Sequence, residues 1–137
     1  MTQLPFVIID HTADWALRVY GRTLNDLFIN AALGMTHLMV ANPDAIPLAE
    51  TRQVELDAYD AESLLVDWLT ELAYWAEAEQ MVGKVFEVTA VSPTHFTATV
   101  HGGKTDELQK HIKAVTFHNL EIIKTDEGLE ATIVFDV

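Results

Sequence analysis

The spacing of the apolar residues constrains the fold of this chain more than any other feature of its sequence. Two segments repeat apolar residues at helical spacing, and the others alternate with the period of a half-buried strand. The longer helical segment, "AESLLVDWLTELAYWAEAEQ" (61–80), follows Asp60, a favourable N-cap residue. Its apolar stripe comprises Leu65, Trp68, Leu69, Leu72 and Trp75. We expect Gly83 to act as the stop after this helix.

The second helical segment lies earlier in the chain. Thr23 is its predicted N-cap, and Asp26 at the third position forms a variant of the capping box. The apolar residues of this helix are Leu24, Leu27, Phe28, Ala31, Met35 and Leu38. The sequence "NPD" (42–44) ends the pattern.

The remaining segments predict strands at 15–21, 52–58, 84–91, 95–102, 113–123 and 129–137. The last two are expected to form a hairpin with Gly128 in its turn. "HGGK" (101–104) is a weak match to a phosphate-binding loop, and a flexible turn fits it better. The order β-α-β-α-β-β-β-β predicts an α+β fold, with two helices packed on one face of a largely antiparallel sheet.

Length and composition predict one domain over 1–137, because a chain of 137 residues that is 50% hydrophobic can form a single core. The absence of cysteine excludes disulfides and thiolate chemistry and fits a cytoplasmic protein. We expect neither a secretory signal nor a membrane association, since no apolar run approaches the length of a membrane span.

The formal net charge of −13 is the strongest compositional feature. With 8 basic against 21 acidic residues, we expect no independent binding to RNA or DNA. The 61–80 helix contributes Asp67 and Glu71 near one face with Asp60, and no Lys or Arg lies between 53 and 83. This acidic surface fits either docking on a basic protein or a solvated face that keeps the protein soluble.

Motifs for nucleotide binding and nucleophilic catalysis are absent from the sequence. There is no G-x-x-x-x-G-K-[ST], G-x-G-x-x-G or G-x-S-x-G pattern. None of the six histidines has the spacing of a metal-binding motif such as H-E-x-x-H. They are His11, His37, His95, His101, His111 and His118.

The last two residues, Asp136 and Val137, lie at the end of a predicted strand. A terminal carboxylate there would lie next to the Asp136 side chain, and with a third carboxylate the two could chelate a hard cation. A frayed terminus with a solvated aspartate is the alternative.

Several motifs together resemble the archease family. They are His11-Thr12-Ala13-Asp14 before a strand ending in Tyr20-Gly21, "TLNDLFINAALGMTHLMV", "ESLLVDWLTELAYWAE", "GGKTDELQKHIKAVTFHNLEI" and the closing Phe135-Asp136-Val137. They follow the family's order over essentially the whole chain. Trp15 stands where the family often has a smaller aliphatic residue, and Phe117 replaces the common tyrosine before His118.

The resemblance implies a function. Archeases are protein partners of the GTP-dependent tRNA-splicing RNA ligase, whose guanylylation and turnover they promote. It implies a divalent-cation site formed by Asp14, Asp136 and the main chain of Val137, with calcium as the ion and magnesium as the alternative. Lys113 and His118 lie in the matching strand and are candidates to assist the ligase. The resemblance implies no catalytic residues of the chain's own, and contact with RNA only through the ligase.

Two other functions fit parts of the sequence. A free-standing metal-dependent hydrolase of a small phosphorylated molecule would use Asp14 and Asp136, with His11 or His118 as the base. A general chaperone or modulator would dock its acidic helix on basic proteins without metal chemistry.

Overall fold

The computed structural model describes residues 5–10 and 14–137. Over these residues it contains strands, two α-helices and one short 3-10 helix. The strands are β1 Phe6–Asp10, β2 Trp15–Gly21, β3 Glu50–Asp57, β4 Met81–Val91, β5 His95–Lys104, β6 Ala114–Thr116, β7 Ile123–Thr125 and β8 Gly128–Asp136. The helices are α1 Leu24–Met39, η1 Pro43–Ala45 and α2 Ala61–Glu79.

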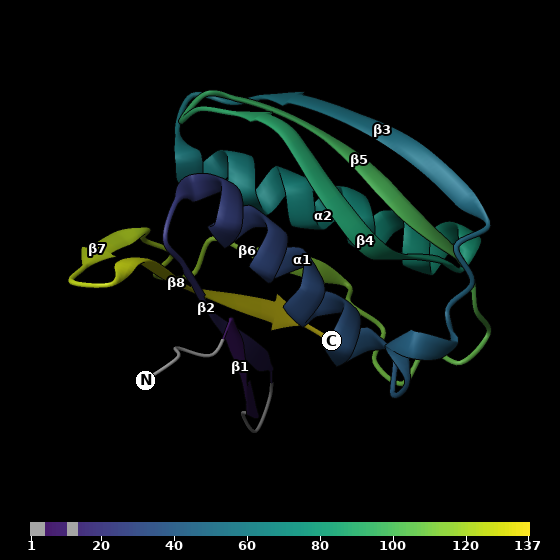
Figure 1. Ribbon diagram of the computed structural model, residues 1–137. Helices are drawn as coiled ribbons and strands as arrows, with labels where there is room; N and C mark the ends of the chain where they lie inside the picture. Colours follow the sequence, from purple (N-terminus) through teal and green to yellow (C-terminus); the bar gives the residue numbers. More distant parts are fainter. Residues whose placement is uncertain (1–4, 11–13) are drawn as a thin grey trace.

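The strands form two antiparallel sheets in the described part of the chain. One has the order β1-β2-β8-β6, with β7 also paired to β8, and the other has the order β3-β5-β4. Both α1 and α2 lie between the sheets and contact strands of each (Figure 1). The α+β class, the pair of helices and the antiparallel pairing are therefore confirmed, and a second sheet covers the other side of the helix layer.

The predicted caps start both helices. The Thr23 side chain accepts a hydrogen bond from the Asp26 N–H at 3.2 Å. The Asp60 carboxylate accepts one from the Ser63 N–H at 2.8 Å, which lowers the pKa of Asp60. The predicted role of Gly83 is wrong, because α2 ends at Gln80, a left-handed residue with φ 56°, and Gly83 lies inside β4.

Trp68 lies at the centre of the core and is fully buried. Its ring centroid is 4.7 Å from that of Phe96 and 5.9 Å from that of Phe86, both in the β3-β5-β4 sheet. Its indole N–H donates to the Phe28 carbonyl oxygen of α1 at 3.0 Å. The Trp68 side chain of α2 thus contacts both α1 and the β3-β5-β4 sheet.

Two strand predictions need correction. "HGGK" is not a flexible turn, because 101–104 lies within β5 and Gly102 and Gly103 are buried. A Cβ atom at Gly102 would collide with the Val82 carbonyl oxygen of the neighbouring strand. The predicted strand at 113–123 is divided into three parts. It contains β6, then a turn in which the Leu120 N–H donates to the Phe117 carbonyl oxygen, and then the first residue of β7.

The other strands lie close to their predicted positions. The β7–β8 hairpin is confirmed, with Gly128 in its turn at φ +134°. The chain has a further strand, β1, which the sequence pattern did not predict. On β8, Ala131, Ile133 and Phe135 are buried and form the face that points into the core.

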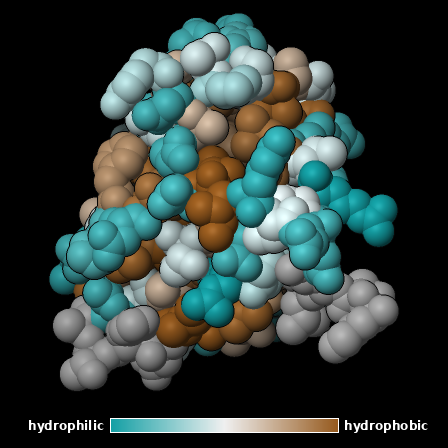
Figure 2. All heavy atoms as spheres, turned by 90° about the vertical axis from the view of Figure 1, so that its left-hand side faces the viewer, coloured by the Kyte–Doolittle hydropathy of each residue, from teal (hydrophilic) through white to brown (hydrophobic). Residues whose placement is uncertain are grey.

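The surface at the end of the molecule where both helices begin is mostly hydrophilic, with hydrophobic residues near its centre (Figure 2). Large exposed hydrophobic residues from segments at this end are Tyr59, Phe117 and Ile123. Within the described residues, no helix has the length and hydropathy needed to cross a membrane.

Candidate metal site

Asp14 and Asp136 come from neighbouring antiparallel strands. Trp15 of β2 pairs with Phe135 of β8. Asp14 immediately precedes Trp15 and Asp136 immediately follows Phe135, so the two aspartates flank the last pair of the β2–β8 ladder, and the same register continued by one pair would set them opposite each other. Opposite residues have Cα atoms about 4.5–5.5 Å apart and side chains on the same face. The two aspartates therefore lie at the same end of the sheet, next to the Trp15–Phe135 pair.

The burial of Phe135 explains why Asp136 is exposed. Phe135 is fully buried against the helix layer, and its neighbour on β6, Val115, is 9% exposed. Because successive side chains of a strand point to opposite faces, Asp136 points away from the core. Asp14 is half-buried, and the C-terminal end of β8 lies at the end of the sheet (Figure 1).

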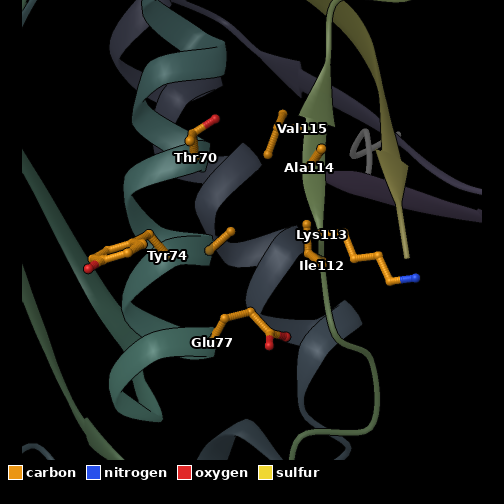
Figure 3. Close-up of a pocket in the computed structure, with 8 residues that line it drawn as sticks. Thr70, Tyr74, Glu77, Ile112, Lys113, Ala114 and Val115 are labelled. Atoms are coloured by element: carbon orange, nitrogen blue, oxygen red, sulfur yellow. The ribbon is translucent and has the colours of Figure 1, made fainter.

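β6 flanks Asp136 on the side opposite β2. Ala114 pairs with Asp136, and the Lys113 N–H donates to the Asp136 carbonyl oxygen at 2.7 Å. The small Ala114 side chain leaves room beside the Asp136 carboxylate. The Lys113 side chain is exposed and points away from α2 (Figure 3). Lys113 thus lies in the same part of the molecule as Asp136.

His118 lies at the opposite end of β6. His118 lies in the turn that follows β6, whereas the residue that pairs with Asp136, Ala114, is the first residue of β6. His118 is exposed, with its Nε2 atom 3.3 Å from the Asn119 side-chain amide. The structure therefore does not bring His118 to Asp136. His11, the other candidate base, lies with Thr12 and Ala13 outside the described residues.

The donor set suits a hard cation. Two carboxylates and main-chain oxygen atoms of Val137 are the ligand types that calcium and magnesium prefer. Calcium takes about six to eight oxygen ligands, so this set would leave coordination positions for water or for groups of a partner. Among the described residues there is no cluster of three or more His, Asp or Glu side chains arranged to hold a metal ion.

Two acidic residues of α2 have cationic or histidine partners, although the sequence around the helix contains no Lys or Arg. Arg52 of β3 binds Glu79 with an N–O distance of 2.9 Å, which lowers the pKa of Glu79. His111 lies 2.8 Å from Glu77. On the same helix Asp67 is exposed and Glu71 is half-buried. The acidic surface is thus concentrated in the middle of α2.

Sequence reasoning missed a pocket between α2 and β6, on the other side of the segment that carries Lys113 (Figure 3). The available signal was Tyr74, a large residue of α2 that falls outside the predicted apolar stripe and is 61% exposed.

Comparisons with known proteins assign the chain to a family. Residues 6–137 match the model of the Archease protein family. A Methanosarcina barkeri protein named protein archease is 38% identical over 137 residues, which cover 94% of this chain and 93% of the relative. The solution structure of Methanobacterium thermoautotrophicum protein 1598 has a TM-score of 0.80 and 34% identity, and the match covers 97% and 99% of the two chains.

A more distant structure shares the fold. The crystal structure of a Thermotoga maritima protein, titled an archease and possible chaperone, has a TM-score of 0.65 at 19% identity. This match covers 100% of this chain and 98% of the other.

Proposed function

Because this chain belongs to the archease family, we propose that it is an accessory protein that activates a GTP-dependent tRNA-splicing RNA ligase through a bound divalent cation. The family resemblance implies a ligase that joins RNA ends bearing a 2′,3′-cyclic phosphate or 3′-phosphate to a 5′-hydroxyl group. The accessory protein would speed guanylylation of the ligase and its return to a further cycle.

The observation that carries the metal part of this proposal is the register of β2 against β8. The pairing ends at Trp15–Phe135, and continuing it by one residue would set Asp14 opposite Asp136, which supports the proposal. We propose that these carboxylates and the main-chain oxygen atoms of Val137 hold the ion. Calcium is the ion the family resemblance favours, and magnesium fits the same oxygen donors.

The residues around the ion would have separate roles. A bound cation would supply positive charge for phosphate oxygens in the ligase's nucleotide site. Asp14 and Asp136 would hold and orient it, while water or ligase groups complete its coordination. The Lys113 ammonium group would add a second positive charge on the β6 side.

The placement of His118 argues against one of the two candidate bases of the free-standing hydrolase; the other, His11, lies outside the described residues. A base that activates a metal-bound water must lie within hydrogen-bond reach of it, directly or through one water. β6 separates His118 from the residue that pairs with Asp136. The accessory role requires no such base.

The test is a guanylylation time course of the cognate ligase with substoichiometric amounts of this protein. We expect wild type to accelerate guanylylation and to show no ligase activity alone. Asp136→Asn should reduce the acceleration by roughly tenfold or more, since a lost metal-site interaction typically costs that much in affinity or activity. Asp126→Asn is the matched control, because Asp126 is an exposed aspartate beside the other end of β8.

Equal guanylylation rates with and without the wild-type protein would overturn the proposed function. Full acceleration by Asp136→Asn would leave the accessory role standing and would remove Asp136 from the metal site.

A further inference from the structure

The pocket between α2 and β6 has a volume of about 250 Å³. Its lining residues are Thr70, Ala73, Tyr74 and Glu77 of α2, and Ile112, Lys113, Ala114 and Val115 at and before β6 (Figure 3). This volume is below the usual range for cofactor and drug-sized ligand sites, about 300–1,000 Å³. The pocket is therefore suited to a single long side chain.

The interior of the pocket is apolar. Ala73 is 7% exposed, Ile112 3% and Val115 9%, so these residues form a surface fixed by the core. Tyr74 differs, because 61% of it is exposed and its ring points away from β6, although the residue also lines the pocket (Figure 3). An aromatic residue held at such an edge can stack on an incoming planar or cationic group.

The pocket has a carboxylate on its α2 side. The Glu77 side chain is 39% exposed and lies 2.8 Å from the exposed His111 ring. Lys113 also lines the pocket, but its ammonium group points away from α2 (Figure 3). Asp67 lies on the α2 face that carries Thr70 and Tyr74, since residues three and four apart share a face. Of the two charged lining residues, Glu77 thus presents its carboxylate on the α2 side, while Lys113 turns its ammonium group away.

We propose that this pocket receives an arginine side chain from a basic segment of a protein partner. The aliphatic part of the arginine would pack on Ala73 and Ile112. Its guanidinium group would pair with the Glu77 carboxylate, displacing His111. The Tyr74 ring, which points away from β6, would turn about its side-chain bonds to stack on the guanidinium group. A protein with a net charge of −13 attracts such a partner before contact is made.

The pocket lies next to the proposed metal site. Ala114 lines the pocket and pairs with Asp136, and Lys113 N–H binds the Asp136 carbonyl oxygen. A segment bound in the pocket would thus bring its protein alongside Asp136. The identity of that protein as the ligase rests on the proposed function, whereas the recognition of arginine rests on the pocket alone.

The first test uses a peptide and does not require the ligase. The probe is acetyl-Ala-Arg-Ala-amide, titrated into the ¹⁵N-labelled full chain, with the citrulline peptide as the neutral control of the same shape. We expect saturable shifts of the backbone amides of Ala73, Tyr74 and residues 112–115. Binding should be about tenfold weaker for the citrulline peptide and for Glu77→Gln. Equal shifts with both peptides, or none at these amides, would overturn the proposal.

The second test measures the affinity of the cognate ligase. Tyr74→Ala should weaken binding about tenfold, the loss expected for an aromatic anchor. Tyr59→Ala is the matched control, because Tyr59 is 86% exposed and does not line the pocket. Equal melting temperatures would show that the variants keep the fold.

The two tests separate the two proposals. If the arginine peptide binds and the wild-type protein does not accelerate guanylylation, the proposed function fails and the pocket inference stands. If guanylylation is accelerated and Tyr74→Ala binds the ligase like wild type, the pocket inference fails for that partner.

Discussion

At the scale of single residues, the proposed site at Asp14 and Asp136 predicts that calcium stabilises the protein. Two carboxylates held close together repel each other, so a cation bound by both should stabilise the folded state. Binding to the folded state alone stabilises by RT ln(1 + [L]/Kd), about 2.7 kcal/mol at a hundredfold excess over Kd. We predict that calcium raises the Tm of wild type and of Asp126→Asn. The rise should be largely lost in Asp14→Asn and in Asp136→Asn.

Thermal unfolding with and without calcium checks this prediction. An equal rise in all four proteins would show that calcium binds elsewhere. The same series with magnesium would show which of the two ions the site prefers.

A second residue-scale prediction concerns His95 on the outer face of the β3-β5-β4 sheet. The Asp57 carboxylate lies 2.7 Å from the His95 ring, and this hydrogen bond raises the pKa of His95 above its ordinary value of 6.5. Since the folded pKa is the higher one, the stabilisation is fully present below pH 6.5 and is lost as the pH rises through the folded pKa.

The Tm difference between wild type and Asp57→Asn should therefore be larger at about pH 5.5 than at about pH 8.5. The effect should be small, because the two side chains are 39% and 77% exposed. Melting curves over this pH range provide the measurement. A difference that does not change with pH would contradict the assignment.

At the scale of elements, the backbones of β5 and β4 approach each other closely at Gly102. A Cβ atom there would collide with the Val82 carbonyl oxygen and lie 2.9 Å from Gly83 Cα, both backbone atoms of β4. Because a backbone moves less readily than a flexible side chain, we predict that Gly102→Ala lowers the free energy of unfolding by about 1–3 kcal/mol.

Thr99→Ala on the same strand is the comparison. Thr99 is half-buried, and its hydroxyl binds the Gln53 side chain at 3.0 Å. We expect a change of about 0.5 kcal/mol there. Urea unfolding of both variants tests the difference, and an equal loss in both would show that the close approach at Gly102 is relaxed at little cost.

The helices could be predicted from the sequence because their signals are local. The Thr23 and Asp60 caps and the apolar spacing lie within each segment, and both caps form as predicted. The second sheet could not be predicted in this way. The small buried residues Ala32 and Ala76 allow close approach on further sides of the helices, and a single-stripe interpretation does not count them.

Long-range contacts explain the remaining differences. The glycines of "HGGK" suggest a turn. In the structure Gly102 lies against the Val82 backbone and Gly103 against Pro47, and both contacts are with residues distant in the sequence. Similarly, the prediction that Asp14 and Asp136 share a site rested on the family resemblance. No local pattern predicts a strand register between residues so far apart in the chain. β6 ends at Thr116, and His118 lies in the turn that follows, with Asn119, whose φ is 52°.

At the scale of the whole molecule, many cationic groups bind the protein's own acceptors. Arg52 binds Glu50 and Glu79. Lys84 donates to the carbonyl oxygens of Asp44 and Ile46, at 3.0 and 3.2 Å. The Lys110 ammonium group lies 4.3 Å from the centroid of the Trp15 ring. These cations are less available to nucleic acid phosphates than their number in the sequence suggests.

This distribution predicts that the protein alone does not bind RNA usefully at physiological salt. Affinity for nucleic acid comes mainly from cations that replace counterions on the phosphates, and here 8 basic residues are opposed by 21 acidic ones. In a mobility assay with bare tRNA near 150 mM salt, we expect no shift at protein concentrations up to about 10 µM. The cognate ligase serves as the positive control, and adding the protein to a ligase–tRNA mixture should shift the RNA further.

A shift by the protein alone that weakens between about 50 and 200 mM salt would contradict this prediction. It would mean that the RNA is contacted directly and not only through the ligase.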